Sequence, residues 1–113
     1  MIITSDSILE NPVVTMDGAK DVRMRILIGP DNGSNRMIMR LFSIMPDGHT
    51  PYHTHDFEHV VRVISGKGLV VDAEGQNHEL SVGQNVFVEP SEKHQFTNPF
   101  DQAFEFTCTI PNV

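Results

Sequence analysis

Short apolar segments, alternating with polar residues and separated by turn residues, constrain the fold of this chain more than any other feature. Residues 22–28 begin with strict alternation, and residues 37–44 are mostly apolar. Residues 103–110 alternate again, which puts a row of apolar side chains on one face. No segment shows the 3.6-residue period of a long amphipathic helix. The pattern therefore predicts an all-β, antiparallel fold, either a sandwich or a barrel.

Clusters of Gly, Pro, Asn and Asp mark where the expected strands end. Residues 46–48 are expected to close the strand at residues 37–44. Residues 65–68 are expected to form a hairpin turn between strands at residues 60–64 and 69–72. Further short strands follow the next turn, and the last strand precedes the C-terminus.

Three histidines and two acids lie within seven residues, in the order His53-Thr54-His55-Asp56-Phe57-Glu58-His59. Neutral imidazole is a good ligand for first-row divalent metals, so several imidazoles that converge make a metal site. In an extended strand, residues two apart point the same way, so His59 would share the face of His53 and His55. Glu58 would point to the opposite face. A bend or bulge at residues 56–57 would reverse that assignment, so Glu58 remains a competitor for the third position.

A fourth histidine, His94, lies in a similar context further along the chain. The alternative to a metal site is a polar surface loop that holds histidines and binds nothing. Three histidines within seven residues, supported by a fourth, favour the metal site. The two remaining histidines, His49 and His78, are expected at the surface, with His78 on an edge strand.

The bulk properties limit the class of protein. The chain has 113 residues, 39% of them hydrophobic, which suffices for one domain with its own core. The formal charge of −7 and the lack of a basic run argue against nucleic-acid binding. A single cysteine, Cys108, excludes an internal disulfide and suits a reducing compartment. Because neither a secretory signal nor an apolar run of roughly 20 residues is present, we expect a cytoplasmic protein without a membrane partner.

The histidine cluster resembles the first motif of the cupin superfamily, whose members fold as a small jelly-roll β-barrel. That motif has a glycine, five residues, His-x-His, three or four residues, a glutamate, six residues and a glycine. Here His53 and His55 supply the pair, and Gly66 supplies the closing glycine. The chain departs from the motif at two places, since Asp47 stands where the opening glycine is expected and His59 stands at the glutamate position.

A second segment resembles the second cupin motif, which has Gly, five residues, Pro-x-Gly, two residues, His, three residues and Asn. Gly83, His94 and Asn98 fall at the required spacings. Glu89 and Ser91 stand where the motif has proline and glycine, so the turn between them is altered.

The resemblance covers about residues 40–110 and implies a single cupin domain over residues 1–113, with residues 1–20 as an N-terminal arm or strand. It implies a mononuclear four-histidine site, similar to that of manganese cupins, with the ligands His53, His55, His59 and His94. It implies one divalent transition metal per chain, with Mn or Fe placed first and Cu, Ni, Co or Zn as options. It also implies open coordination positions and a homodimer in which exposed strand edges are covered.

The expected function is that of a small metalloenzyme that oxidises or cleaves a small organic molecule with dioxygen at the four-histidine centre. Two alternatives stay open. One is a non-redox, metal-dependent isomerase or decarboxylase, and the other is a cupin that binds a small ligand without turnover. No catalytic residue is assigned, and no cofactor other than the metal is expected.

Other residues have simpler expected roles. Arg40 and Arg62 would bind a substrate carboxylate if they faced inward, but the parity of Arg62 relative to His59 points it outward. Cys108 is expected to pack as a small apolar residue. Four phenylalanines are expected in the core or the pocket wall, and these are Phe87, Phe96, Phe104 and Phe106.

Overall fold

The computed structural model describes residues 1–113, which form eight strands and two short 3-10 helices. The elements are η1 (Asp6–Ile8), β1 (Lys20–Ile28), η2 (Pro30–Asn32), β2 (Met37–His49), β3 (His59–Ser65), β4 (Lys67–Val71), β5 (Asn77–Ser81), β6 (Asn85–Val88), β7 (Gln95–Thr97) and β8 (Phe104–Pro111). Every strand pair is antiparallel, so the all-β, antiparallel prediction is confirmed. Neither helix is long or apolar enough to cross a membrane.

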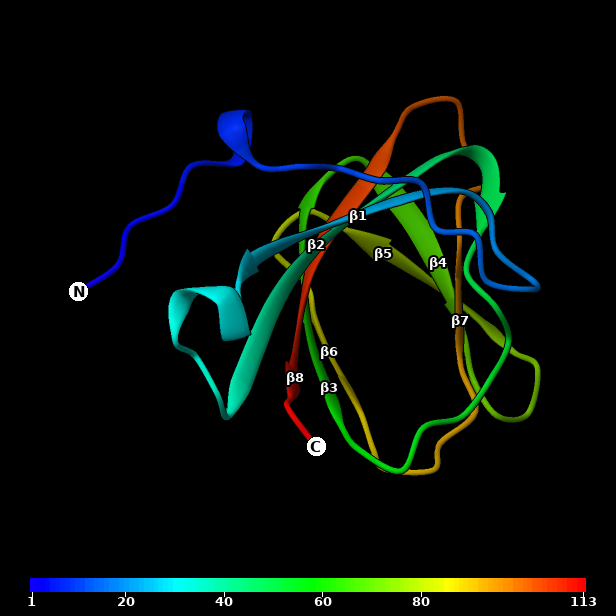
Figure 1. Cartoon of the computed structure of the whole chain (residues 1–113). Coiled ribbons are helices and arrows are strands. Elements are labelled where there is room, and N and C mark those ends of the chain that lie inside the picture. Colours follow the sequence, from blue (N-terminus) through cyan, green and yellow to red (C-terminus); the bar gives the residue numbers. More distant parts are fainter.

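The strands form one curled sheet, a jelly-roll half-barrel, in the order β5-β4-β7-β2-β8-β3-β6 with β1 paired to β2 (Figure 1). One wall holds β1, β2, β8, β3 and β6, and the other holds β5, β4 and β7. The two walls join where the last residue of β2, His49, pairs with Thr97 of β7. The curl gives the sheet an inner face, on which both the core and the pocket lie.

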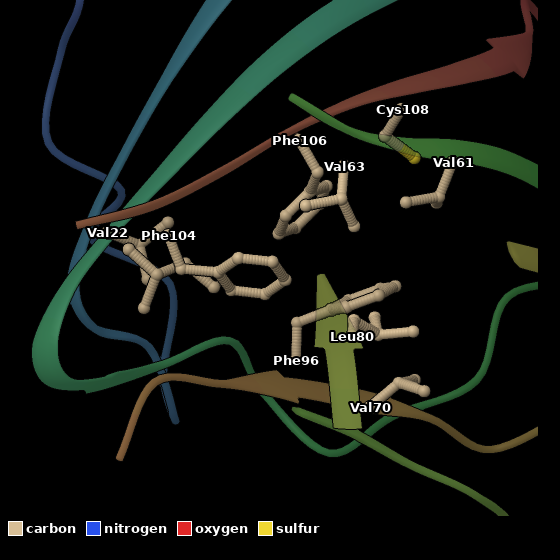
Figure 2. Close-up of a cluster of buried hydrophobic side chains, with 10 residues drawn as sticks. Val22, Val61, Val63, Val70, Leu80, Phe96, Phe104, Phe106 and Cys108 are labelled. Carbon is tan, nitrogen blue, oxygen red and sulfur yellow. The ribbon is translucent and has the colours of Figure 1, made fainter. Parts of the chain in front are cut away.

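The core follows from the two-residue period of the strands. On β8, Phe104, Phe106 and Cys108 point inward and are almost completely buried. The same period buries Val61 and Val63 on β3. Figure 2 shows these side chains packed between the two walls, with the three phenylalanine rings in the middle. The alternation predicted for residues 103–110 is therefore confirmed.

The hairpin expected around residues 65–68 is wrong. Strand β3 pairs with β6 and β8, whereas β4 pairs with β5 and β7, so the chain crosses between the walls at Gly66. Gly66 has a φ of 72°, and a Cβ there would lie 2.0 Å from the carbonyl oxygen of Ala103. A Cβ at Gly68 would lie 2.1 Å from the ring of Phe104. The two glycines allow the chain to pass close to β8. A hairpin turn is also rich in glycine, so the sequence alone does not distinguish the two structures.

The strand expected to close at residues 46–48 continues to His49. A bulge accommodates Pro46 there, because the register shifts between Lys20↔His49 and Val22↔Ile44. Residue Asp47 takes a φ of 66° inside this bulge. The predicted turn residues therefore form a bulge, and the chain pairs with β1 again after it.

Residues 1–12 form an arm and contain no strand. The arm runs outside the body of the sheet and ends away from it (Figure 1). Thr4 Oγ1 donates to the carbonyl of Leu27 at 2.9 Å, and the Arg25 guanidinium donates to the carbonyl of Asp6. These contacts hold the arm against β1 without a ladder of backbone hydrogen bonds.

Candidate metal centre

Two segments carry the four histidines of the predicted site. His53 and His55 lie in the loop between β2 and β3, and His59 is the first residue of β3. His94 lies just before β7. The backbones of His53 and His94 exchange two hydrogen bonds, with N···O distances of 3.2 and 3.0 Å. This isolated bridge fastens the histidine loop to the opposite wall.

The structure brings all four imidazoles together. The ring centroids of His53 and His55 are 4.3 Å apart, and those of His59 and His94 are 4.8 Å apart. The His55–His59 and His53–His94 separations are 5.2 and 5.4 Å. The chain bends at residues 56–57, so the segment is not one extended strand, yet His59 still reaches the inner face.

The competing residues lie elsewhere. Glu58 does not line the pocket, although its neighbours Phe57 and His59 do. His49 also lies outside the pocket. The His78 ring is exposed on the edge strand β5 and pairs with the Asp72 carboxylate at 2.7 Å. The surface and edge positions expected for His78 are therefore confirmed.

The local environment favours the neutral form of three of the clustered imidazoles, those of His53, His55 and His59. Burial, with His55 and His94 nearby, lowers the pKa of His53 to about 4. Burial, with His94 and Arg40 nearby, lowers the pKa of His59 to about 3. Burial lowers the pKa of His55 as well, against the opposing effect of Asp56. Neutral imidazoles keep the lone pairs that a metal needs, because protonation would remove them.

The donor chemistry fits a transition metal. Nδ1 of His59 is buried and has no hydrogen-bond partner, which is costly unless something else binds that ring. Nδ1 of His94 lies 2.9 Å from the carbonyl oxygen of Glu92, and a carbonyl only accepts. A proton on Nδ1 of His94 would satisfy this contact and would leave Nε2 as the ring nitrogen able to bind a metal. In their present positions, the side chains do not form a set of three or more ligands that could hold a metal ion.

The histidines form one end of an apolar pocket. Its walls come from the inner faces of β1, β2 and β8, and Phe42, Phe96 and Phe106 line it. The segment before β1 adds Val14 and Met16, which no periodic pattern in the sequence singled out. Parity with the buried Val22 could have identified Met24 as a further lining residue, because both lie on the inner face of β1. No Asp or Glu side chain lines the pocket.

The other residues considered from the sequence divide between the two faces of the sheet. Arg40 and Cys108 line the pocket. Arg62 points outward and bonds the Asn85 side chain at 2.9 Å, as its parity predicted. Phe87, expected in the core or the pocket wall, is 60% exposed, so that expectation is wrong. Its neighbours on β6 point inward, and alternation leaves Phe87 on the outer face.

The altered motif positions have a common backbone conformation. Asp47 and Ser91, which stand where the two motifs have glycines, both have a φ of 66°. Asn98 is completely buried, and its Nδ2 donates to the carbonyls of Ile44 and Gln102 at 2.8 and 2.7 Å. Asn98 therefore closes the turn before β8 and has a structural role.

Comparison with known proteins gives one family and many similar structures. The family model described as a cupin domain matches residues 40–110. No curated protein matches the chain in sequence. The structure of the polyketide cyclase RemF from Streptomyces resistomycificus is similar over 100% of this chain and 80% of its own, with 28% identity and a TM-score of 0.95.

Two less similar structures share the fold. A cupin-2 domain from Rhodospirillum rubrum has 20% identity and a TM-score of 0.84, covering 100% of this chain and 75% of that one. A protein described as a predicted oxalate decarboxylase, from Thermotoga maritima, has 21% identity and a TM-score of 0.83, covering both chains fully.

Proposed function

The chain belongs to the cupin domain family, and from that premise we propose that it is a metal-dependent enzyme that closes a ring in an extended, enolisable substrate. The pocket carries this proposal, because its apolar and aromatic walls end at a cluster of four imidazoles. The 28% identity to a polyketide cyclase over the whole chain supports the same reaction class.

The residues proposed to hold the metal are His53, His55, His59 and His94. One divalent transition metal per chain, with Mn or Fe placed first and Zn, Cu, Ni or Co as options, would supply Lewis acidity toward a carbonyl oxygen of the substrate. Four neutral ligands cancel none of the metal's charge, so the site favours substrates that carry an anionic oxygen.

The rest of the pocket orients the substrate and excludes water. Phe96 and Phe106 lie with their ring centroids 4.5 Å apart, and Phe42 stacks on Phe106 at 5.3 Å. A conjugated chain folded against this wall would bring its two reacting carbons together, and apolar walls would protect the enolate from solvent protons. A Lewis-acidic metal and an apolar wall that orients the substrate suit ring closure. In that reaction a carbon–carbon bond forms, water leaves and there is no net oxidation or reduction.

Oxygen-dependent oxidation of the same kind of substrate is the second candidate. It is supported by a pocket that lacks an Asp or Glu to act as a general base, because oxidation depends less on proton transfer. Binding without turnover is the remaining alternative.

One experiment separates the three. The protein, reconstituted with a single metal, is incubated with a linear aryl β-polyketone in a cell that records dissolved oxygen, and products are analysed by mass spectrometry. Ring closure predicts product lighter by one water, formed equally fast without oxygen. Oxygen uptake that matches product formation would favour oxidation, and unchanged substrate that still binds stoichiometrically would leave a ligand-binding cupin.

A further inference from the structure

Arg40 is the one lysine or arginine among the residues that line the pocket. It lies on the inner face of β2, two residues before Phe42, and pairs across the sheet with Cys108 of β8. Its Nη2 donates to Cys108 Sγ at 3.1 Å, and its Cζ lies 4.9 Å from the centroid of the Phe42 ring. The guanidinium is therefore held by a thiol and an aromatic face.

The charge of Arg40 has no counterion in the protein. Neither ion pair in the structure involves Arg40, although the chain carries a net charge of −7. Its Nε is buried without a hydrogen-bond partner. Burial raises the pKa of the Cys108 thiol, so the sulfur is neutral and does not balance the charge. A half-buried cation without an acidic partner destabilises the empty pocket. An anionic ligand would balance this charge, so the pocket favours anions.

Aromatic rings connect Arg40 to the histidines. From Phe42 the stack passes to Phe106 at 5.3 Å, then to Phe96 at 4.5 Å, and Phe96 meets the His94 ring at 6.1 Å. All of these residues line the same pocket.

We propose that Arg40 is the specificity-determining residue of the pocket and binds an anionic oxygen of a planar, conjugated substrate. The guanidinium would donate hydrogen bonds from its free N–H groups to a carboxylate, enolate or phenolate of the substrate. The planar part of the substrate would pack against the phenylalanine rings. The other end of the substrate would then reach the four histidines. This proposal adds a substrate class to the proposed function. It rests on that function only in placing the reaction at the four histidines.

Two probes that differ in charge test the proposal. Naphthalene-2-carboxylate and its neutral relative naphthalene-2-carboxamide are titrated into metal-free protein by isothermal calorimetry at neutral pH. The wild type and the variants Arg40→Met, Arg40→Lys and Arg62→Met are compared. Arg62→Met is the matched control because Arg62 faces outward.

The proposal predicts that Arg40→Met weakens binding of the carboxylate by about 10- to 100-fold, the usual range for a lost charge-assisted hydrogen bond. Binding of the carboxamide should change by less than about threefold, and this also shows that the variant is folded. Arg40→Lys should recover part of the affinity, and Arg62→Met should match the wild type.

Equal losses for both probes in Arg40→Met would overturn the proposal, since they would mean that Arg40 only shapes the pocket. Unchanged affinity for the carboxylate would overturn it too, and so would failure of the wild type to bind either probe. The assay contains no metal and no turnover, so a failed cyclase assay does not decide it. A negative result here likewise leaves the cyclase proposal standing.

Discussion

At the scale of single residues, two backbone positions explain departures of this sequence from the cupin motifs. Asp47 and Ser91 occupy the left-handed region of φ, where glycine is the least strained residue. Asp and Ser pay a steric cost there. The backbone N–H of Ser91 donates to the carbonyl of His55 at 2.6 Å, so this strained turn also supports the histidine loop.

Replacing Ser91 with glycine should therefore stabilise the protein. We expect Ser91→Gly to raise the free energy of unfolding by about 0.5–1 kcal/mol, because the relief of strain exceeds the extra chain entropy of glycine. Denaturant unfolding of the metal-free protein measures it. Ser91→Ala is the control and should not stabilise. Equal stability of the glycine and alanine variants would show that the positive φ carries no cost.

The lowered pKa values of the histidines predict how stability depends on pH. In the folded, metal-free protein His53 and His59 titrate well below 6.5, so the unfolded chain binds more protons between these values. Stability should therefore be full above pH 6.5 and decline as the pH falls toward about 4 and 3, the folded pKa values. Thermal unfolding scans follow this decline, and the His59→Asn variant should show a shallower slope. A flat profile for the wild type would contradict the assignment of neutral, buried imidazoles.

At the scale of elements, the strands were predictable and their partners were not. Alternation identified the strands that became β1 and β8, and a mostly apolar run identified β2. The glycines between β3 and β4 carried a hairpin signal, yet they serve a crossing between the walls. Local composition does not distinguish these outcomes, because the reason for glycine lies in Ala103 and Phe104, far along the chain.

A glycine-to-alanine series tests the crossing. Gly68→Ala should cost about 2–3 kcal/mol, because the new Cβ would lie 2.1 Å from the Phe104 ring inside the core. Gly75 is the control, since it has a φ of 79° but no atom within 4 Å of an added Cβ. Gly75→Ala should cost about 1 kcal/mol from backbone strain alone. Chemical denaturation gives both values, and equal costs would refute close packing as the reason for Gly68.

At the scale of the whole molecule, the outer face of the larger wall carries a row of exposed apolar side chains. Met39, Val60 and Phe87 are 38, 55 and 60% exposed and lie in one row across the sheet, linked through Thr109. Among the residues of the N-terminal arm, Ile3 is 84% exposed. An exposed apolar row of this kind is a candidate surface for contact with another protein chain.

We propose that a second copy of the chain covers this row, so that the expected homodimer forms through a sheet face and not through strand edges. Sedimentation should give a dimer for the wild type and a monomer for Val60→Arg, which places a charge in the centre of the row. The outward-facing Glu79→Arg on β5 is the control and should remain dimeric. A monomeric wild type would contradict the proposal.

The candidate site was predictable in its histidines and not in its walls. His53, His55, His59 and His94 stood out because clustered imidazoles are rare and match a motif. Phe57 and Met16 line the same pocket from irregular segments, where no period reveals which way a side chain points. For Arg40, the sequence predicted only that it would bind a substrate carboxylate if its side chain faced inward. Which side chains meet in a pocket depends on how the strands curl, and short-range patterns do not encode that.

Metal content is the property that decides whether the four histidines hold a metal. Elemental analysis of the purified protein is compared between the wild type, His59→Ala and Glu58→Ala. We predict close to one transition metal per wild-type chain, a sharp fall in His59→Ala and no change in Glu58→Ala, because Glu58 lies outside the pocket. Wild-type protein that holds no metal even after reconstitution would contradict the account.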